Sequence, residues 1–138
     1  MASIFSQIIA GQIPCYKIAE NETCFAFLDV FPIAAGHTLL VPKIEIDNLH
    51  DLDSDTHAAL FAFSKQIAQA IGNAIPCRKV GMAVVGLEVP HAHIHLVPLN
   101  VVADLDFSKP KVKAEEDTLH HFQKLIQASF QQVLLSVC

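Results

Sequence analysis

Three histidines alternate with apolar residues in the second half of the chain, at His91, His93 and His95. Successive side chains on a β-strand point to opposite faces. A strand over this segment would therefore place the three imidazoles on one face and the intervening apolar side chains on the other. A buried imidazole needs partners for both ring nitrogens, so such a row is more typical of a cleft than of a core.

Metal binding is one chemistry that suits this row. Residues two apart on a strand lie about 7 Å apart and can share an ion, whereas residues four apart lie about 13 Å apart. A zinc–nitrogen bond measures only about 2.1 Å. Two histidines of the row would therefore need a further ligand, such as His37 or Asp29. A metal-dependent hydrolase that uses two of these histidines is one alternative.

Nucleophilic catalysis is the second chemistry. A neutral imidazole nitrogen can attack phosphorus while a backbone carbonyl or a neighbouring histidine holds the other nitrogen. Flanking imidazoles can donate hydrogen bonds to phosphoryl oxygens and to the leaving group. A row of three supplies a central nucleophile with a donor on either side. We therefore favour phosphoryl chemistry over metal binding, with His93 as the nucleophile.

The elements that must position this row follow from apolar periodicity and turn residues. The predicted strands are 16–20, 23–29, 37–41, 80–86 and 93–97, and the first two form a hairpin around Asn21 and Glu22. The predicted helices are 3–11, 54–75 and 114–130. Strands grouped around one long helix indicate an α+β fold with a mainly antiparallel sheet.

Two helices carry apolar stripes that face the predicted core. The long helix has apolar residues at steps of three or four, namely Leu60, Phe63, Ile67, Ile71 and Ile75. Ser54 or Asp53 can cap its first turn. The final helix is predicted to turn Leu119, Phe122, Leu125 and Ile126 inward.

Length and composition limit the classes of function. The chain has 138 residues, 52% of them apolar and 17% charged, which fits a single folded domain over 1–138 rather than a disordered chain. A net charge of −5 argues against a broad basic surface for nucleic acid, although local donors can still hold a small phosphate. The four cysteines form no CxxC pair and are expected to be reduced thiols. The first residues show neither a signal peptide nor a membrane span, so we expect a cytoplasmic location and no membrane partner.

The histidine row resembles the HxHxHxx signature of the histidine triad (HIT) family, and three further blocks resemble the family in the family's order. Residues 3–14 resemble its opening, where an aromatic residue and isoleucines wall the base pocket. Residues 26–30 resemble the strand whose aspartate, here Asp29, holds the ribose hydroxyls. Residues 35–43 resemble the GHxLxxPK strand, whose histidine, here His37, faces the phosphate. The similarity spans about 3–100, which leaves a C-terminal helix and tail at about 114–138.

The resemblance implies a Hint-like fold: about five antiparallel strands, one long helix and shorter flanking helices. It also implies a homodimer joined mainly through the long helix and a strand. The expected ligand is a purine nucleotide such as AMP, and no cofactor is expected. The residues implied for the base and ribose pocket are Ile4, Phe5, Ile8, Ile13, Phe27, Val30 and Asp29.

The resemblance further implies chemistry at the α-phosphate of a nucleoside 5′-phosphate derivative. His93 would form a covalent nucleotidyl-histidine, His91 would orient and polarise it, and His95 and His37 would contact the phosphate. Substrates of the family include nucleoside phosphoramidates, acyl-adenylates and dinucleoside polyphosphates.

The chain departs from the family pattern in three places. Glu88 stands where many members carry Ser or Thr beside the leaving group. A carboxyl with a raised pKa could act there as an acid, whereas an ionised one would repel phosphate. The amide residue of many members is not visible within 80–85, which keeps a nucleotide-binding or scaffolding protein with weak or no catalysis as an alternative.

The third departure concerns zinc. Ser3 and Ser6 occupy the positions of a CxxC pair that binds structural zinc in some bacterial members, and hydroxyls are poor zinc ligands. His50 matches a zinc histidine of those members, but alone it is more typical of a polar residue beside a helix. We therefore predict that no metal is bound.

Overall fold

The computed structural model describes residues 2–136. Its strands are β1 (Lys17–Glu20), β2 (Cys24–Leu28), β3 (Thr38–Pro42), β4 (Lys79–Ala83) and β5 (Ile94–Leu99). Its α-helices are α1 (Ile4–Ile9), α2 (Ser54–Ala74) and α3 (Glu116–Leu135), and two short 3₁₀ turns lie at Leu49–Asp51 and Val102–Asp104. All paired strands are antiparallel, in the order β1-β2-β3-β5-β4. The prediction of an α+β fold with a five-stranded antiparallel sheet is confirmed.

Local residue chemistry explains where several elements begin. Ser3 caps α1 by accepting a hydrogen bond from the backbone N–H of Ser6, and Asp53 caps α2 by accepting one from Thr56. The predicted hairpin is confirmed: the side chain of Asn21 accepts hydrogen bonds from the backbone N–H groups of Thr23 and Cys24. The turn therefore has its own polar partners before the two strands pair.

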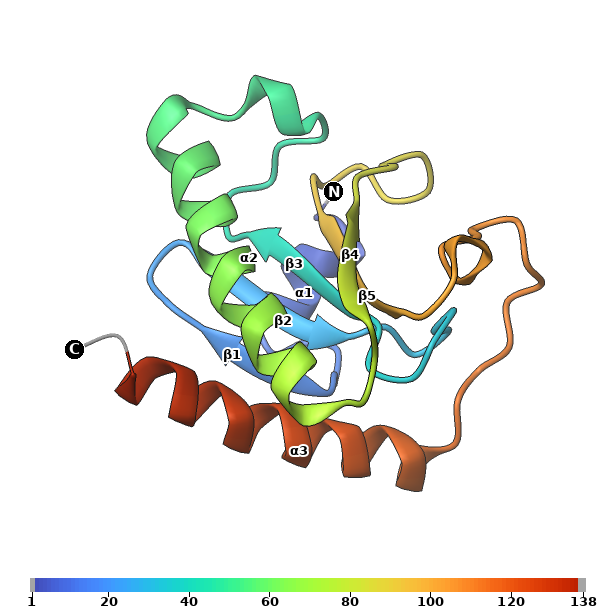
Figure 1. Cartoon of the computed structure of the whole chain (residues 1–138). Helices are drawn as coiled ribbons and strands as arrows, with labels where there is room; N and C mark the ends of the chain where they lie inside the picture. Colours follow the sequence, from blue (N-terminus) through green and yellow to red (C-terminus); the bar gives the residue numbers. More distant parts are fainter. Residues whose placement is uncertain (1, 137–138) are drawn as a thin grey trace.

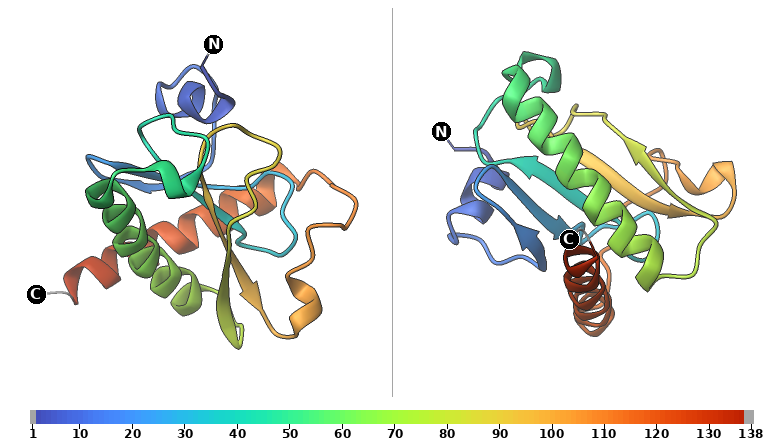
Figure 2. Two further views of the ribbon diagram at one scale, coloured as in Figure 1. Left: turned by 90° about the horizontal axis from the view of Figure 1, so that it is seen from above. Right: turned by 60° about the vertical axis from the view of Figure 1, so that its left-hand side comes forward.

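The sheet separates two apolar layers. In Figures 1 and 2, α2 crosses one face with α3 beside it, while α1 lies on the opposite face. The larger core lies on the face of α2 and α3 and includes Leu40, Leu60, Ile67, Ile94, Leu96 and Ile126. The smaller cluster joins α1 to the other face and consists of Phe5, Phe25, Phe27, Leu39 and Val41.

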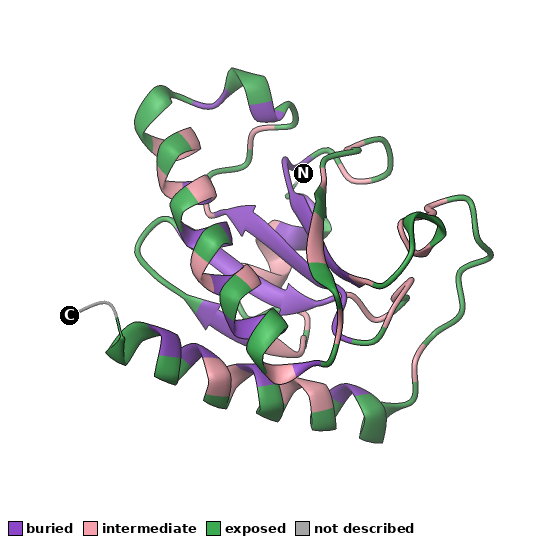
Figure 3. Cartoon of the chain, viewed as in Figure 1, coloured by how far each residue is buried: buried purple, intermediate pink, exposed green. Residues whose placement is uncertain are grey.

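The strands β2 and β3 are buried along their whole length (Figure 3), which means that both of their faces are covered. Alternation then decides which residues face α1. Phe27 pairs with Leu39, and Leu39 pairs with His95, so the three side chains form one row on the α1 face. The apolar residues between the histidines supply the larger core.

The outer edge at β1 is also covered. Gln123 and Gln127, one turn apart on α3, both donate hydrogen bonds from their side-chain amides to the backbone oxygen of Lys17, at 3.0 and 2.8 Å. On the same helix, the Ser129 hydroxyl donates to the backbone oxygen of Ala70 at 2.7 Å. The C-terminal helix is thus fixed both to β1 and to α2.

Most predicted boundaries differ from the structure by one or two residues, and three differences affect the site or the core. The fourth strand ends at Ala83 rather than at residue 86, because the exposed segment that follows has no neighbouring strand. The fifth strand starts at Ile94, so His91 and His93 precede it. The final helix continues to Leu135, because no Gly or Pro interrupts it and Val133 is buried.

One residue of the final helix was predicted to face inward and does not. Leu125 is 39% exposed, whereas the adjacent Ile126 is fully buried. Neighbouring helical positions point about 100° apart, and α2 covers only the side that carries Ile126. None of the described helices is long and apolar enough to cross a membrane.

Candidate active site

His93 lies just before β5 with its ring against α1. Its Nδ1 is 2.8 Å from the backbone oxygen of His91. A carbonyl oxygen only accepts hydrogen bonds, so the hydrogen of the neutral ring is on Nδ1 and the lone pair is on Nε2. The ring is 6% exposed, and this burial lowers its pKa below the usual histidine value. The side chain is thus unprotonated at neutral pH, with a lone pair on Nε2.

His95 and His37 form a hydrogen-bonded pair beside this ring, with His37 Nε2 at 2.9 Å from His95 Nδ1. The backbone N–H of Ile33 donates to His37 Nδ1 at 3.2 Å, so the hydrogen of neutral His37 is on Nε2. His37 must then donate to His95, whose own hydrogen is on Nε2. Burial lowers the pKa of both histidines to about 4, so both are neutral at pH 7.

His91 is fully buried and has partners on both nitrogens. Its Nε2 is 2.7 Å from the backbone oxygen of Pro42, and its Nδ1 is 2.8 Å from the hydroxyl of Ser3. Phe5 lies against the triad, with its ring centroid 5.0 Å from that of His93 and 5.8 Å from that of His91. The structure therefore gathers the predicted histidines around α1, with the His91 ring in the interior.

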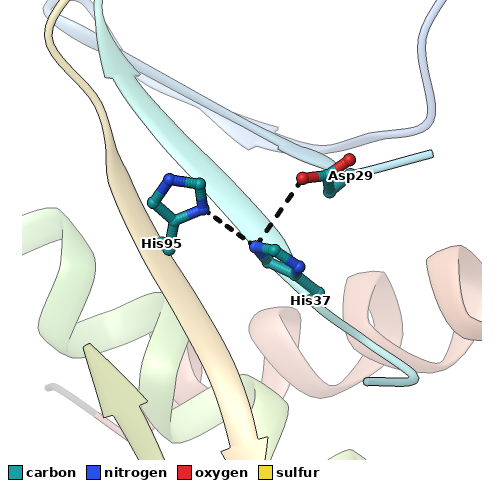
Figure 4. Close-up of side chains that lie close together, drawn as sticks. All are labelled: Asp29, His37 and His95. Atoms are coloured by element: carbon teal, nitrogen blue, oxygen red, sulfur yellow. Dashed lines mark hydrogen bonds and ion pairs between the residues drawn. The ribbon is translucent and has the colours of Figure 1, made fainter. Parts of the chain in front are cut away.

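Asp29 follows β2 and approaches the histidine pair from the side (Figure 4). One of its oxygens accepts a hydrogen bond from the backbone N–H of Phe31 at 2.8 Å, and the other lies 3.7 Å from His37 Nε2. The carboxylate is thus held at the rim of the site.

Asp29, His37 and His95 are also the described residues closest to a metal-binding arrangement, with one ligand atom of each within 4.8 Å of the others. Their hydrogen bonds do not suit a cation. The hydrogen between His37 and His95 would have to leave, and moving it to His37 Nδ1 would set it against the N–H of Ile33. The residues present fit a proton-bearing pair better than a metal.

The residues predicted for the base pocket divide between two environments. Phe5 and Phe27 are buried, with ring centroids 5.5 Å apart, and Ile8 packs against the same cluster. Val30 instead packs against the larger core on the other face. Ile4 is 48% exposed and Ile13 is half-buried. Of these residues, the ones that pack together are therefore those on α1 and β2.

Glu88 lies outside this buried group. It is exposed and pairs with Lys111. The hydrogen bond from that ammonium lowers the pKa of Glu88, so the carboxylate is ionised. A general acid at this position would need a raised pKa, so the suggestion that Glu88 acts as an acid is wrong.

Sequence reasoning missed Phe107, which lies beside the histidines, and Lys111, which pairs with Glu88, because both lie in a segment with the composition of a solvated linker. The ring of Phe107 lies 4.7 Å from that of His95 and 6.2 Å from that of His37, measured between centroids. Lys111 pairs with Glu88, and the nearby N–H of Ala114 donates to the backbone oxygen of Val30 at 2.9 Å. A lone aromatic residue among charged ones was the available signal for Phe107.

A cavity of about 370 Å³ opens beside His93. It is lined by Asp47, Asn48, Leu49, His50, Val84, Val85, Gly86, Ala92 and His93. His93 therefore borders an open space although the residue is largely buried.

Sequence comparison identifies relatives of known activity. A family model described as "HIT domain" matches residues 10–101. The chain is 35% identical over 100 residues to adenosine 5′-monophosphoramidase hnt1 of Schizosaccharomyces pombe, with 71% of this chain and 74% of that protein covered. It is 31% identical over 100 residues to adenylylsulfatase HINT3 of Arabidopsis thaliana, with 69% of this chain and 51% of that protein covered.

Solved structures show the same fold. A hypothetical histidine triad nucleotide-binding protein from Sulfolobus tokodaii matches with a TM-score of 0.83 and 27% identity, over 94% of this chain and 92% of that one. A zinc-bound histidine triad family protein from Mycobacterium smegmatis matches with a TM-score of 0.84 and 27% identity, over 99% and 98%.

Proposed function

The chain belongs to the histidine triad (HIT) family, and on that premise we propose that it is a nucleotide hydrolase or transferase. Its substrate is a nucleoside 5′-phosphate derivative, either a phosphoramidate, an acyl-adenylate or a dinucleoside polyphosphate. It acts on the α-phosphate through a covalent nucleotidyl-histidine at His93. The observation that carries this proposal is the 2.8 Å contact between His93 Nδ1 and the backbone oxygen of His91, which leaves Nε2 as a free nucleophile.

The reaction has two displacements at phosphorus. The lone pair of His93 Nε2 attacks, the N–P bond forms, and the bond to the leaving group breaks with its electron pair going to that group, which gains a proton from solvent when it is an amine. The ring then carries a positive charge, which the hydrogen bond from Nδ1 to the His91 carbonyl stabilises. Water attacks the same phosphorus, the electron pair returns to Nε2, the nucleoside monophosphate leaves, and a proton passes to solvent.

The neighbouring side chains assist in different ways. His95 donates its Nε2–H to a phosphoryl oxygen, and His37 holds His95 in that tautomer rather than acting mainly on the phosphate. Asp29 accepts hydrogen bonds from the ribose hydroxyls. A purine base lies against the α1 wall that contains Phe5 and Ile8.

Replacement of His93 tests the mechanism. His93→Asn should abolish turnover of adenosine 5′-phosphoramidate while AMP binding, measured by calorimetry, stays within about threefold, because the base and ribose contacts remain. Mass spectrometry of quenched wild-type reactions should detect a nucleotidyl adduct on His93. Turnover retained by His93→Asn, or an adduct on another residue, would reject this mechanism.

A nucleotide-binding protein with little catalysis is the second candidate. The ionised Glu88 beside the triad and the lack of an amide residue within 80–85 favour it, because both weaken phosphate binding. AMP binding without hydrolysis of any of the three substrate classes would support it. A cytoplasmic location belongs to either candidate as a proposal, and cell fractionation would test it.

We also propose a homodimer formed through α2 and β4. Ala58, Ala62 and Gly72 are exposed on α2, and Met82 of the edge strand β4 is 42% exposed. Small side chains on an outward helix face allow close approach of a second copy, and an exposed methionine beside them supplies apolar contact.

A further inference from the structure

A hydrogen-bonded cluster at the start of α1 includes the ring of His91, and the side chains of this cluster have no part in the mechanism above. We call Ser3, Glu45 and His91 the N-terminal anchor. The Ser3 hydroxyl lies 2.8 Å from His91 Nδ1, and the backbone N–H of Ser3 donates to Glu45 Oε1 at 2.6 Å. Ser3 itself is 7% exposed and His91 is fully buried. The anchor therefore joins α1 and the loop after β3, where Glu45 is exposed, to the buried ring of His91.

The direction of each hydrogen bond in the anchor can be assigned. The Pro42 carbonyl accepts from His91 Nε2 at 2.7 Å, so neutral His91 carries its hydrogen there and Nδ1 must accept. The Ser3 oxygen already accepts from the backbone N–H of Ser6 at 3.0 Å. Its own hydrogen is then free to point at Nδ1. The Ser6 hydroxyl is 3.5 Å from the same nitrogen and donates instead to Glu45 at 2.7 Å.

The anchor leads directly to the nucleophile. The same residue whose ring Ser3 holds supplies the backbone oxygen that accepts from His93 Nδ1. The peptide unit that carries this oxygen is also held from its other side, because its N–H, that of Ala92, donates to the backbone oxygen of Ile46 at 2.7 Å. Ile46 follows Glu45, the residue whose side chain accepts a hydrogen bond from the backbone N–H of Ser3. The ring of His91 is thus held by Ser3 and its peptide by the loop that contains Glu45 and Ile46, and the carbonyl that orients His93 lies between these two contacts.

We propose that Ser3 is a positioning residue for the nucleophile, acting through His91. Its hydroxyl fixes the His91 ring with hydrogen on Nε2 and so holds the His91 carbonyl in line with His93 Nδ1. The catalytic part of this inference rests on the function proposed for His93. The simpler role of Ser3 is that of a helix cap, and the experiment must separate the two.

Three variants make this separation. Ser3→Gly removes the hydroxyl, yet glycine caps a helix almost as well as serine. Ser3→Thr keeps both the hydroxyl and the cap. Ser6→Ala, the matched control, removes a hydroxyl one turn along the same helix without touching the 2.8 Å bond. Adding Ser6→Ala to Ser3→Gly prevents the second hydroxyl from moving into the place of the first.

Two readouts are needed. Loss of one buried hydrogen bond to a group that must be aligned predicts about a tenfold fall in kcat for Ser3→Gly and for the double variant, with KM within about twofold. Ser3→Thr and Ser6→Ala should stay within about threefold of wild type. Long-range ¹H–¹⁵N correlation spectra should show the His91 hydrogen on Nε2 in wild type, Ser3→Thr and Ser6→Ala, and a mixture of tautomers in the double variant.

The outcomes distinguish this inference from the proposed function. If the double variant keeps the wild-type kcat and the wild-type His91 tautomer, Ser3 is only a cap and the inference is overturned. If wild type turns over no nucleotide, the proposed function fails. The His91 spectra then decide alone whether Ser3 fixes the ring, with an unchanged tautomer in the double variant counting against it.

Discussion

The histidines of the site differ in what their hydrogen bonds leave free. His91 has both nitrogens engaged, and His93 keeps a lone pair on Nε2. His95 keeps an N–H on Nε2, because His37 occupies its other nitrogen. One residue type thus presents a ring with no free nitrogen, a ring with a free lone pair and a ring with a free N–H, and the carbonyls and N–H groups around each ring decide which.

Phe107 contributes to the electrostatics of His95 by keeping water away from it. Phe107→Ala should raise the pKa of His95 from about 4 toward its ordinary value, by about one unit, because the cation becomes better solvated. NMR titration of the ring protons measures this shift. Phe107→Leu, which retains an apolar cover, should change the pKa of His95 much less. Equal pKa values in wild type and in Phe107→Ala would show that the aromatic ring does not control this burial.

The sequence predicts which residues form the candidate site better than it predicts which side chains contact them. Alternation alone places the histidine row on one face, and the paired row of Phe27, Leu39 and His95 agrees with it. Phe107 and Lys111 lie in the long connection between β5 and α3, which folds back toward the site. Local periodicity in the sequence does not predict the course of such a connection. The fully buried position of His91 likewise depends on a serine 88 residues away.

The three helices show where apolar patterns succeed and where they fail. The stripe on α2 is buried as predicted, because the helix lies flat on a sheet that covers one side of it. On α3 the prediction is wrong at Leu125, because this helix meets its neighbours along a narrower line. A pattern read along one helix gives its apolar side but not the width of its contact.

Adjacent residues of α3 should therefore differ sharply in their contribution to stability. Ile126→Ala removes a fully buried side chain and should lower the free energy of unfolding by about 2–4 kcal/mol. Leu125→Ala, the matched control at a 39% exposed position, should cost less than about 1 kcal/mol. Urea denaturation followed by circular dichroism measures both. Similar losses in the two variants would mean that α3 is packed differently from this description.

The molecule as a whole is a sheet with helices on both faces and one helix along an edge (Figure 2). The order of the strands follows from the hairpin of β1 and β2 and from the pairing of β3 with β5. The sequence predicts the first of these through its turn residues. The second joins segments more than fifty residues apart, and no local pattern in the sequence predicts it.

The proposed homodimer can be tested on this outer surface. Ala62→Arg places a long charged side chain on the exposed face of α2 and should convert a dimer into monomers in sedimentation velocity experiments. Ala128→Arg makes the same change at an exposed position of α3 and should leave the sedimentation coefficient unchanged. A dimer that survives Ala62→Arg would place the interface elsewhere.

The hydrogen bonds from Gln123 and Gln127 to the backbone oxygen of Lys17 have a consequence for association between chains. Tyr16 turns its carbonyl toward β2, so the carbonyl of Lys17 points away from the sheet, where an added strand would bond. The glutamine amides occupy that acceptor in advance. A strand of another chain can therefore pair less easily with the edge strand β1 than with the edge strand β4. A chain shortened before α3 would leave the β1 edge uncovered as well and would be more prone to aggregation.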